Sequence, residues 1–315
     1  MTNQKDSTGS KKKSSWAARV RIIGTLLSLG LLIWLLSQQN WEIFFNIAGD
    51  LNVLSLLLAL LLILGRMFTT SVRWFRLLKA QKTDVTLLQT VQFVFAGRFA
   101  SNFLPTTIGG DVIRAAAVIP YSENKVAGAA SVVLDRLIGV FGMLFFLPFC
   151  IVLIPAVPSI PLLSMMPMTV FTEKLLDTVR KTFLRLREAV LIWRNKPSSL
   201  VQALLASWAG TLLYITGVWV LAVDVNIDVS WVEVAAASVV TYFVVLIPLS
   251  INGLGLRELT VIGLYTALGA SPEQAAALAI LTRALQMIAT IPGAFWLGKM
   301  VPDRSENNDG GVRDG

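Results

Sequence analysis

The feature that most constrains this chain is a series of long apolar stretches separated by short polar segments. A run of about 20 apolar residues is long enough to cross the hydrocarbon core of a bilayer as one helix. None of the runs shows the strict alternation that is typical of barrel strands. We therefore predict an all-α, polytopic integral membrane protein with about six full spans. The expected spans are 22–37, 51–72, 126–155, 204–223, 232–249 and 275–297.

The composition supports this class and excludes several kinds of chemistry. The 315 residues are 55% hydrophobic and only 15% charged, whereas soluble domains carry roughly a quarter charged residues. The chain has no histidine and a single cysteine, Cys150, which lies in an apolar run. Nucleophilic catalysis by serine or cysteine paired with histidine is therefore excluded. We expect no cofactor, no metal site and no enzymatic activity. The net charge of +8 is only weak evidence for binding to nucleic acid, because membrane proteins carry lysine and arginine in cytoplasmic loops.

The polar ends and basic segments indicate the domain organisation. Residues 1–15 read as a disordered, basic cytoplasmic tail, 16–301 as a single transmembrane domain and 302–315 as a second disordered tail. We expect the protein in the cell (plasma) membrane. Basic residues just before the first span place its N-terminus in the cytoplasm by the positive-inside rule. Residues 173–196 form a basic amphipathic pattern that favours a helix lying on the membrane surface, with an acidic partner as the alternative.

The direction of the second half depends on whether the chain crosses the membrane within 156–172. If it does, the basic segment 173–196 lies in the cytoplasm and the two halves of the protein are inverted relative to each other. If it does not, the halves run parallel and the C-terminus is external. We choose the inverted arrangement, because a basic helix is well placed against anionic cytoplasmic lipid.

An internal repeat relates two halves, at about 51–155 and 203–298. Pro105, Gly110 and Arg114 each have a counterpart 143 residues later. Gly/Pro-interrupted apolar segments at matching places in two halves indicate the binding site of a transporter, because unwound backbone persists at membrane depth only beside a polar cavity. We therefore predict two broken or re-entrant helices. The alternative is a pair of interfacial loops.

Ionisable residues inside apolar stretches are costly and mark candidate functional sites. All the basic members of this set are arginine, whose guanidinium stays charged when desolvated and matches phosphate in a bidentate fork. Arg283 lies deepest in its span, and its alternative role is an ion pair with one of the acidic residues. Arg66 and Arg98 could reach an interface, and Asp135-Arg136 could be a self-contained pair. The set comprises Arg66, Arg98, Asp111, Arg114, Asp135, Arg136, Arg257, Glu258 and Arg283.

These residues predict a slot for an anionic lipid headgroup. The expected headgroup-binding residues are Arg114, Arg136, Arg257, Arg283, Gly109, Gly110, Gly253 and Gly255. The expected supporting charges, which hold the arginines when the slot is empty, are Asp111, Asp135, Glu258 and Arg98. The helix breaks are expected at Pro105 and Pro248.

The same motifs carry a resemblance to a known family. Leu104-Pro105-x-x-x-Gly109-Gly110-Asp111-x-x-Arg114, Asp135-Arg136-Leu137-x-Gly139 and Pro248-x-x-x-x-Gly253-x-Gly255-x-Arg257-Glu258 occur in this order. The chain resembles the flippase-like family of the lysylphosphatidylglycerol synthase transmembrane region over roughly residues 20–300. The resemblance implies movement of an anionic phospholipid between leaflets. The aminoacyl-transferase domain of the full synthases is missing from this sequence, so synthesis is not implied.

Three functions remain open on these grounds. The first is translocation of an anionic phospholipid or polyprenyl-phosphate lipid. The second is a lipid-binding scaffold or partner of a separately encoded lipid-modifying enzyme. The third is a membrane enzyme that acts on a lipid phosphate, for which Asp111, Asp135 and Glu258 would be the available bases.

Overall fold

The computed structural model is a bundle of helices. It describes residues 49–104, 109–159, 196–246, 253 and 255–300, and helix is the only regular secondary structure in these ranges, which confirms the all-α prediction. The predictions for the two tails, the first span, the surface helix, Pro105, Pro248 and most of the crossing at 156–172 fall outside the described residues.

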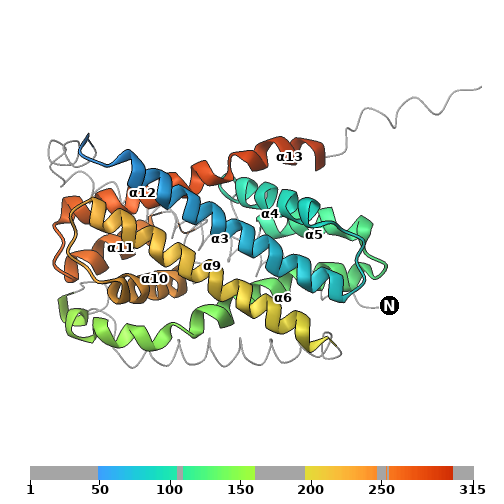
Figure 1. Ribbon diagram of the computed structural model, residues 1–315, viewed down its shortest axis with the longest axis horizontal. Helices are drawn as coiled ribbons and strands as arrows, with labels where there is room; N and C mark the ends of the chain where they lie inside the picture. Colours follow the sequence, from blue (N-terminus) through green and yellow to red (C-terminus); the bar gives the residue numbers. More distant parts are fainter. Residues whose placement is uncertain (1–48, 105–108, 160–195, 247–252, 254, 301–315) are drawn as a thin grey trace, which may run out of the picture.

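Two long helices form the centre of the bundle. Helix α3 (Val53–Ala80) and helix α9 (Pro197–Asp224) each contain 28 residues and lie side by side along the long axis of the molecule (Figure 1). The helices are antiparallel, because the backbone N–H of Asn52 before α3 donates to the Asp224 carboxylate at the end of α9 (3.2 Å). The two helices approach closely at glycines: a Cβ on Gly217 would lie 3.3 Å from Leu62 Cβ.

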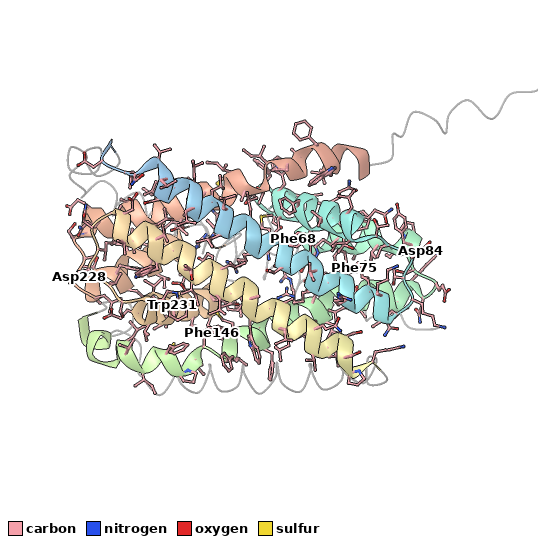
Figure 2. All side chains as sticks on the ribbon, viewed as in Figure 1. Phe68, Phe75, Asp84, Phe146, Asp228 and Trp231 are labelled. Atoms are coloured by element: carbon pink, nitrogen blue, oxygen red, sulfur yellow. The ribbon has the colours of Figure 1, made fainter. Side chains whose placement is uncertain are left out.

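A pair of shorter helices follows each long helix. Helix α4 (Leu87–Ser101), capped by Thr86, is followed by α5 (Gly109–Val118), and helix α10 (Trp231–Leu246) is followed by α11 (Leu256–Ala267). Each pair packs against itself, and the two pairs lie at opposite ends of the long axis (Figure 1). The loops that lead into α4 and α10, marked by Asp84 and Asp228, are likewise at opposite ends (Figure 2).

The helix expected over 126–155 is shorter in the structure. A turn of 3₁₀-helix, η1 (Ile119–Tyr121), precedes α6, which runs from Lys125 to Leu144 after the Asn124 cap. The chain then continues as 3₁₀-helix η2 (Leu147–Ser159). Pro148 lacks the backbone N–H that an α-helix would need at this point, so the α-helix cannot continue through it.

The last expected span is bent. Helix α12 (Pro272–Thr290) and helix α13 (Pro292–Met300) meet at an angle of 41° where a single span over 275–297 was predicted. Pro292 again removes a backbone donor at the junction. Pro272, in contrast, opens α12 at a position where its missing N–H has no cost.

Packing is crosswise between the early and late parts of the chain. Segment η2 packs on α10, and α13 packs on α4, where Gly293 lies directly against the Phe95 backbone. Helix α6 packs on α9, and α12 packs on α3. The described core is therefore shared by helices from both parts of the chain.

The outer face of the bundle is apolar. Side chains on α3 such as Leu54, Leu61 and Phe68 are 72%, 64% and 49% exposed, and Phe68 is marked in Figure 2. Among the described residues three helices (α3, α6 and α9), or four if α12 and α13 form one span, are long and apolar enough to cross a membrane. Helix α10, with 16 residues, rises roughly 24 Å. The chain is a membrane protein with several apolar helices, and the predicted count of six spans is not reached within the described part.

Candidate functional site

A buried carboxylate joins three helices inside the bundle. Asp135 on α6 is 1% exposed and accepts hydrogen bonds from Arg73 Nε on α3 (2.6 Å) and Arg114 Nη2 on α5 (2.8 Å). Arg73 also donates to Ser207 Oγ on α9 (3.1 Å), and the Arg114 guanidinium lies 4.2 Å from the centre of the Trp74 ring. These contacts place two guanidinium groups on one carboxylate.

A second carboxylate extends the cluster toward the start of α5. Asp111 forms ion pairs with Arg136 and with Arg114 Nη1, the latter at 3.4 Å. The interpretation of Asp135-Arg136 as a self-contained pair is therefore wrong. Neighbouring residues on a helix point about 100° apart, so each finds a partner on another helix.

The cluster lines a cavity of about 250 Å³, which we call the ion-pair cavity. Its basic residues are balanced in part by the two aspartates just described. Its charged lining residues are Arg66, Arg73, Arg98, Asp111, Arg114, Asp135 and Arg136.

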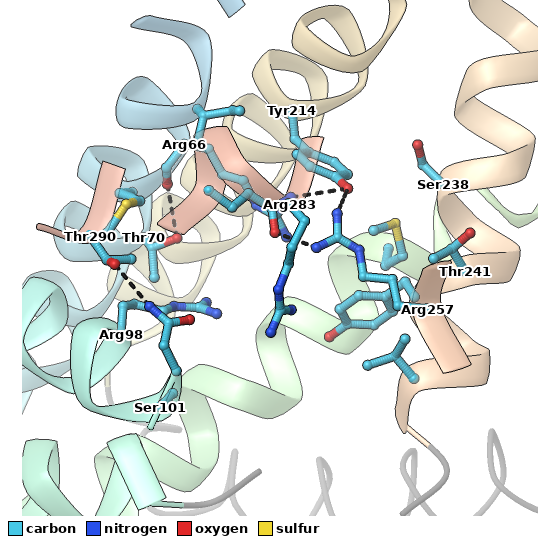
Figure 3. Close-up of a pocket in the computed structure, with 17 residues that line it drawn as sticks. Arg66, Thr70, Arg98, Ser101, Tyr214, Ser238, Thr241, Arg257, Arg283 and Thr290 are labelled. Carbon is cyan, nitrogen blue, oxygen red and sulfur yellow. Dashed lines mark hydrogen bonds between the residues drawn. The ribbon is translucent and has the colours of Figure 1, made fainter. Parts of the chain in front are cut away.

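A second cavity of about 250 Å³ adjoins the first, and we call it the arginine cavity. The two cavities share part of their wall, including Arg66, Thr70 and Arg98 on α3 and α4. None of the described residues that line the arginine cavity is acidic, and its charged lining residues are Arg66, Arg98, Arg257 and Arg283 (Figure 3). Within the part of the chain that the structure describes, the lining of this space is therefore positively charged and contains no carboxylate.

Neutral side chains orient two of these arginines. Arg257 donates to Gln286 Oε1 (2.6 Å) and to the Tyr214 hydroxyl (3.1 Å). The Arg66 guanidinium lies 4.0 Å from the centre of the Tyr214 ring. Arg66 occupies the middle of α3, roughly 20 Å from either end, which does not support the alternative that it reaches an interface. Tyr214 and Gln286 thus hold the guanidinium groups in place without neutralising them.

Arg283 projects into the space between Arg98 and Arg257 (Figure 3). Its Nε is buried and has no hydrogen-bond partner among the described residues. The alternative of an internal ion pair is not seen there, because Asp111 and Asp135 bind Arg73, Arg114 and Arg136 instead. None of the ion pairs found in the described ranges involves Arg98.

Glu258, which we predicted as a supporting charge for the arginines, lies in the first turn of α11. Its buried carboxylate accepts a hydrogen bond from the backbone N–H of Gly255 (2.9 Å) at the start of α11. It makes no ion pair with an arginine in the described part of the chain. Glu258 therefore fixes the helix start, and its charge also acts favourably on Arg283 without a direct ion pair.

The glycines at the predicted breaks lie where a side chain would not fit. Gly109 and Gly110 open α5, and a Cβ on Gly110 would collide with the Gly97 carbonyl and Ser101 Oγ on α4. Gly253 and Gly255 have φ of +71° and +76°, in the left-handed region that favours glycine. Helix α5 thus begins at Gly109, inside the break that we expected at 105–111, whereas α11 begins directly after Gly255.

Comparison with known proteins decides the family. The model of the lysylphosphatidylglycerol synthase TM region matches residues 21–293. The chain belongs to this family. A comparison with curated proteins found no match. Membership of the family relates this membrane protein to lipid handling and leaves its substrate open.

Sequence reasoning missed three residues of the site in this family member. The basic residues Arg73, Arg76, Lys79 and Lys82 follow the expected span 51–72, and the sequence alone favours a cytoplasmic position for them, yet Arg73 is buried whereas Arg76 is exposed. The spacing of seven residues between Arg66 and Arg73, two helical turns, was the available signal. Tyr214 and Gln286 escaped notice because they carry no charge, although Gln286 follows Arg283 by one turn of α12.

Proposed function

We propose that this protein binds the headgroup of an anionic phospholipid or polyprenyl-phosphate lipid in the arginine cavity and moves it between leaflets. The observation that carries the proposal is the presence of two adjoining cavities, both lined by arginines, inside an apolar bundle. Ionisable residues inside a membrane protein are costly, and they mark candidate substrate sites. Guanidinium groups match phosphate oxygens in number and geometry.

The order and length of the helices support a repeated architecture. A 28-residue helix, a pair of short helices and a helix of 19–20 residues occur twice, as α3–α6 and as α9–α12. The antiparallel contact of α3 with α9 and the opposite positions of the two short pairs fit inverted halves (Figure 1). We propose that these are the repeated halves, within a domain of about six spans in the cell membrane whose N-terminus is cytoplasmic. Inverted repeats with broken helices at their interface are a recurrent plan of alternating-access transporters.

In the proposed mechanism only the headgroup enters the protein. Each cavity has a volume of about 250 Å³, below the roughly 300–1,000 Å³ of pockets that enclose whole ligands. The acyl or prenyl tails stay in the surrounding lipid. The headgroup binds between Arg66, Arg98 and Arg283 and passes along the shared wall toward Arg114 and Arg136, which Asp111 and Asp135 hold when the slot is empty. The protein forms and breaks no covalent bond in this proposal.

Transport by purified protein tests the proposal. We expect Arg283→Gln to lower the rate of translocation of a fluorescent phosphatidylglycerol in liposomes by roughly tenfold or more, since a hydrogen bond to a charged group contributes about 1.5–3 kcal/mol. The control is Arg76→Gln, the same change at an exposed position of α3. An Arg283→Gln rate equal to that of wild type, with the control also unchanged, would contradict a headgroup role.

The same preparation separates transport from binding alone. Retention of the lipid on the protein without any translocation in liposomes would favour the second candidate, a binding partner of a lipid-modifying enzyme. That candidate uses the same arginines, so the Arg283→Gln variant should then lose retention.

A further inference from the structure

The two halves of the protein differ in where they place carboxylates. Arg114 and Arg136 correspond in the repeat to Arg257 and Arg283. Asp111, three residues before Arg114, has Leu254 as its counterpart, and Asp135, which precedes Arg136, has Thr282. The arginines are repeated and the aspartates are not.

The structure gives this difference a physical form. In the ion-pair cavity Arg73, Arg114 and Arg136 each contact a carboxylate. In the arginine cavity the contacts of Arg257 are the neutral Gln286 and Tyr214, and the contact of Arg66 is the ring of Tyr214. The arginine cavity therefore keeps four formal positive charges in about the same volume in which the other cavity balances two of its five.

We propose that the arginine cavity selects a phosphate group that carries at least two negative charges, such as a terminal phosphomonoester or pyrophosphate, over a singly charged phosphodiester. The inference rests on the proposed function and names the substrate class of the same site. None of these four guanidiniums forms an ion pair within the described residues, although Glu258 and Asp111 act on Arg283 and Arg98 from further away. Such a group is stabilised more by each added negative charge on the ligand, because Coulomb energy scales with the product of the charges.

The shape of the ligand supports the same choice. A terminal phosphate has a charge of roughly −1.5 to −2 at pH 7 and three strong acceptor oxygens. Arg66, Arg98 and Arg283 approach the space from three helices, α3, α4 and α12 (Figure 3). A phosphodiester has one oxygen fewer to offer and a second substituent that must also fit within about 250 Å³.

Two lipids with identical acyl chains test the selection. The full chain is placed in nanodiscs that contain equal amounts of phosphatidic acid, a phosphomonoester, and phosphatidylglycerol, a phosphodiester, and the lipids retained after extraction are measured by native mass spectrometry. We expect phosphatidic acid to be retained about tenfold over phosphatidylglycerol, a factor within the range of one charge-assisted hydrogen bond. Equal retention of both lipids overturns the selection and leaves the proposed function intact, whereas retention of neither lipid counts against both.

A second arm distinguishes the source of the phosphate. Thermal unfolding is measured in detergent with and without inorganic pyrophosphate. No shift beside strong retention of phosphatidic acid assigns the site to a lipid headgroup. A clear rise in unfolding temperature supports the same anion chemistry from a free phosphate and counts against lipid transport.

Gln286→Glu tests the charge argument itself. The new carboxylate has nearly the shape of the amide that already accepts from Arg257 at 2.6 Å, so it would neutralise one guanidinium in place. We expect the preference for phosphatidic acid to fall about tenfold, whereas Gln202→Glu, the same change at an exposed position of α9, should leave it unchanged.

A separate variant guards against a folding defect in Gln286→Glu. Arg98→Gln removes one charge from the same cavity at a residue that is exposed in the structure and forms none of the ion pairs described above. We expect this variant to lower the preference for phosphatidic acid over phosphatidylglycerol in the same way. An undiminished preference in a folded Arg98→Gln or Gln286→Glu protein overturns the proposal.

Discussion

Replacement of Asp135 by asparagine should lower the free energy of unfolding by about 3–5 kcal/mol, the range found when one partner of a buried ion pair is removed. The carboxylate is 1% exposed and is shared by Arg73 and Arg114. Without it two guanidinium groups would remain inside the bundle beside a neutral amide. Thermal unfolding of purified protein in detergent measures the effect.

The matched control for this change is Asp228→Asn, in the exposed loop before α10 (Figure 2). It should leave the unfolding temperature within the error of the wild type. Removal of Arg73 together with Asp135 should cost less than the sum of the single changes, because the two residues interact directly. Additive losses, or a stable Asp135→Asn protein, would show that the cluster does not hold α3, α5 and α6 together.

Valine at Gly110 should abolish transport and destabilise the protein by about 1–3 kcal/mol or more, as overpacking of a close contact does. The added side chain would occupy the space of the Gly97 carbonyl and Ser101 Oγ, where α5 crosses α4. The displaced helix carries Asp111 and Arg114, so the ion-pair cluster would be disturbed as well. Liposome transport and thermal unfolding measure the two effects.

Gly298→Val provides the comparison for the close contact at Gly110. A Cβ on Gly298 in α13 would have no atom within 4 Å, so this variant should retain transport. Gly253→Val should behave like Gly110→Val, since Gly253 has φ of +71° and its Cβ would lie 2.9 Å from Val245 Cγ1. Equal effects at all three glycines would contradict the assignment of the two breaks as close-packed elements of the site.

The membrane class, the helix restarts and the close-packed glycines could be predicted because each depends on local sequence. Apolar runs of span length need lipid around them, and Gly110 and Gly253 lie where Pro and Gly interrupt such runs. The helix end at Leu144 was missed, since the apolar run continues through Pro148 and hydropathy alone does not register a lost N–H donor.

The partners of the charged residues could not be predicted from one sequence. Asp135 and Arg136 are adjacent in the chain but pair with other residues on other helices, and Arg73 lies 62 residues from the carboxylate that it contacts. Such pairs depend on how helices pack, which hydropathy does not encode. Neutral residues are not found when only charged residues are considered. The contacts by which Tyr214 and Gln286 orient Arg66 and Arg257 could therefore be recognised only in the structure.

Native mass spectrometry of the protein purified from its own membranes tests the central proposal most directly. We expect the wild-type chain to carry a bound anionic phospholipid or polyprenyl phosphate. The double variant Arg66→Gln, Arg283→Gln, which halves the charge of the arginine cavity, should lose this lipid, while Arg76→Gln retains it. A folded double variant that holds the same anionic lipid at wild-type occupancy would contradict the assignment of the arginine cavity as the headgroup site.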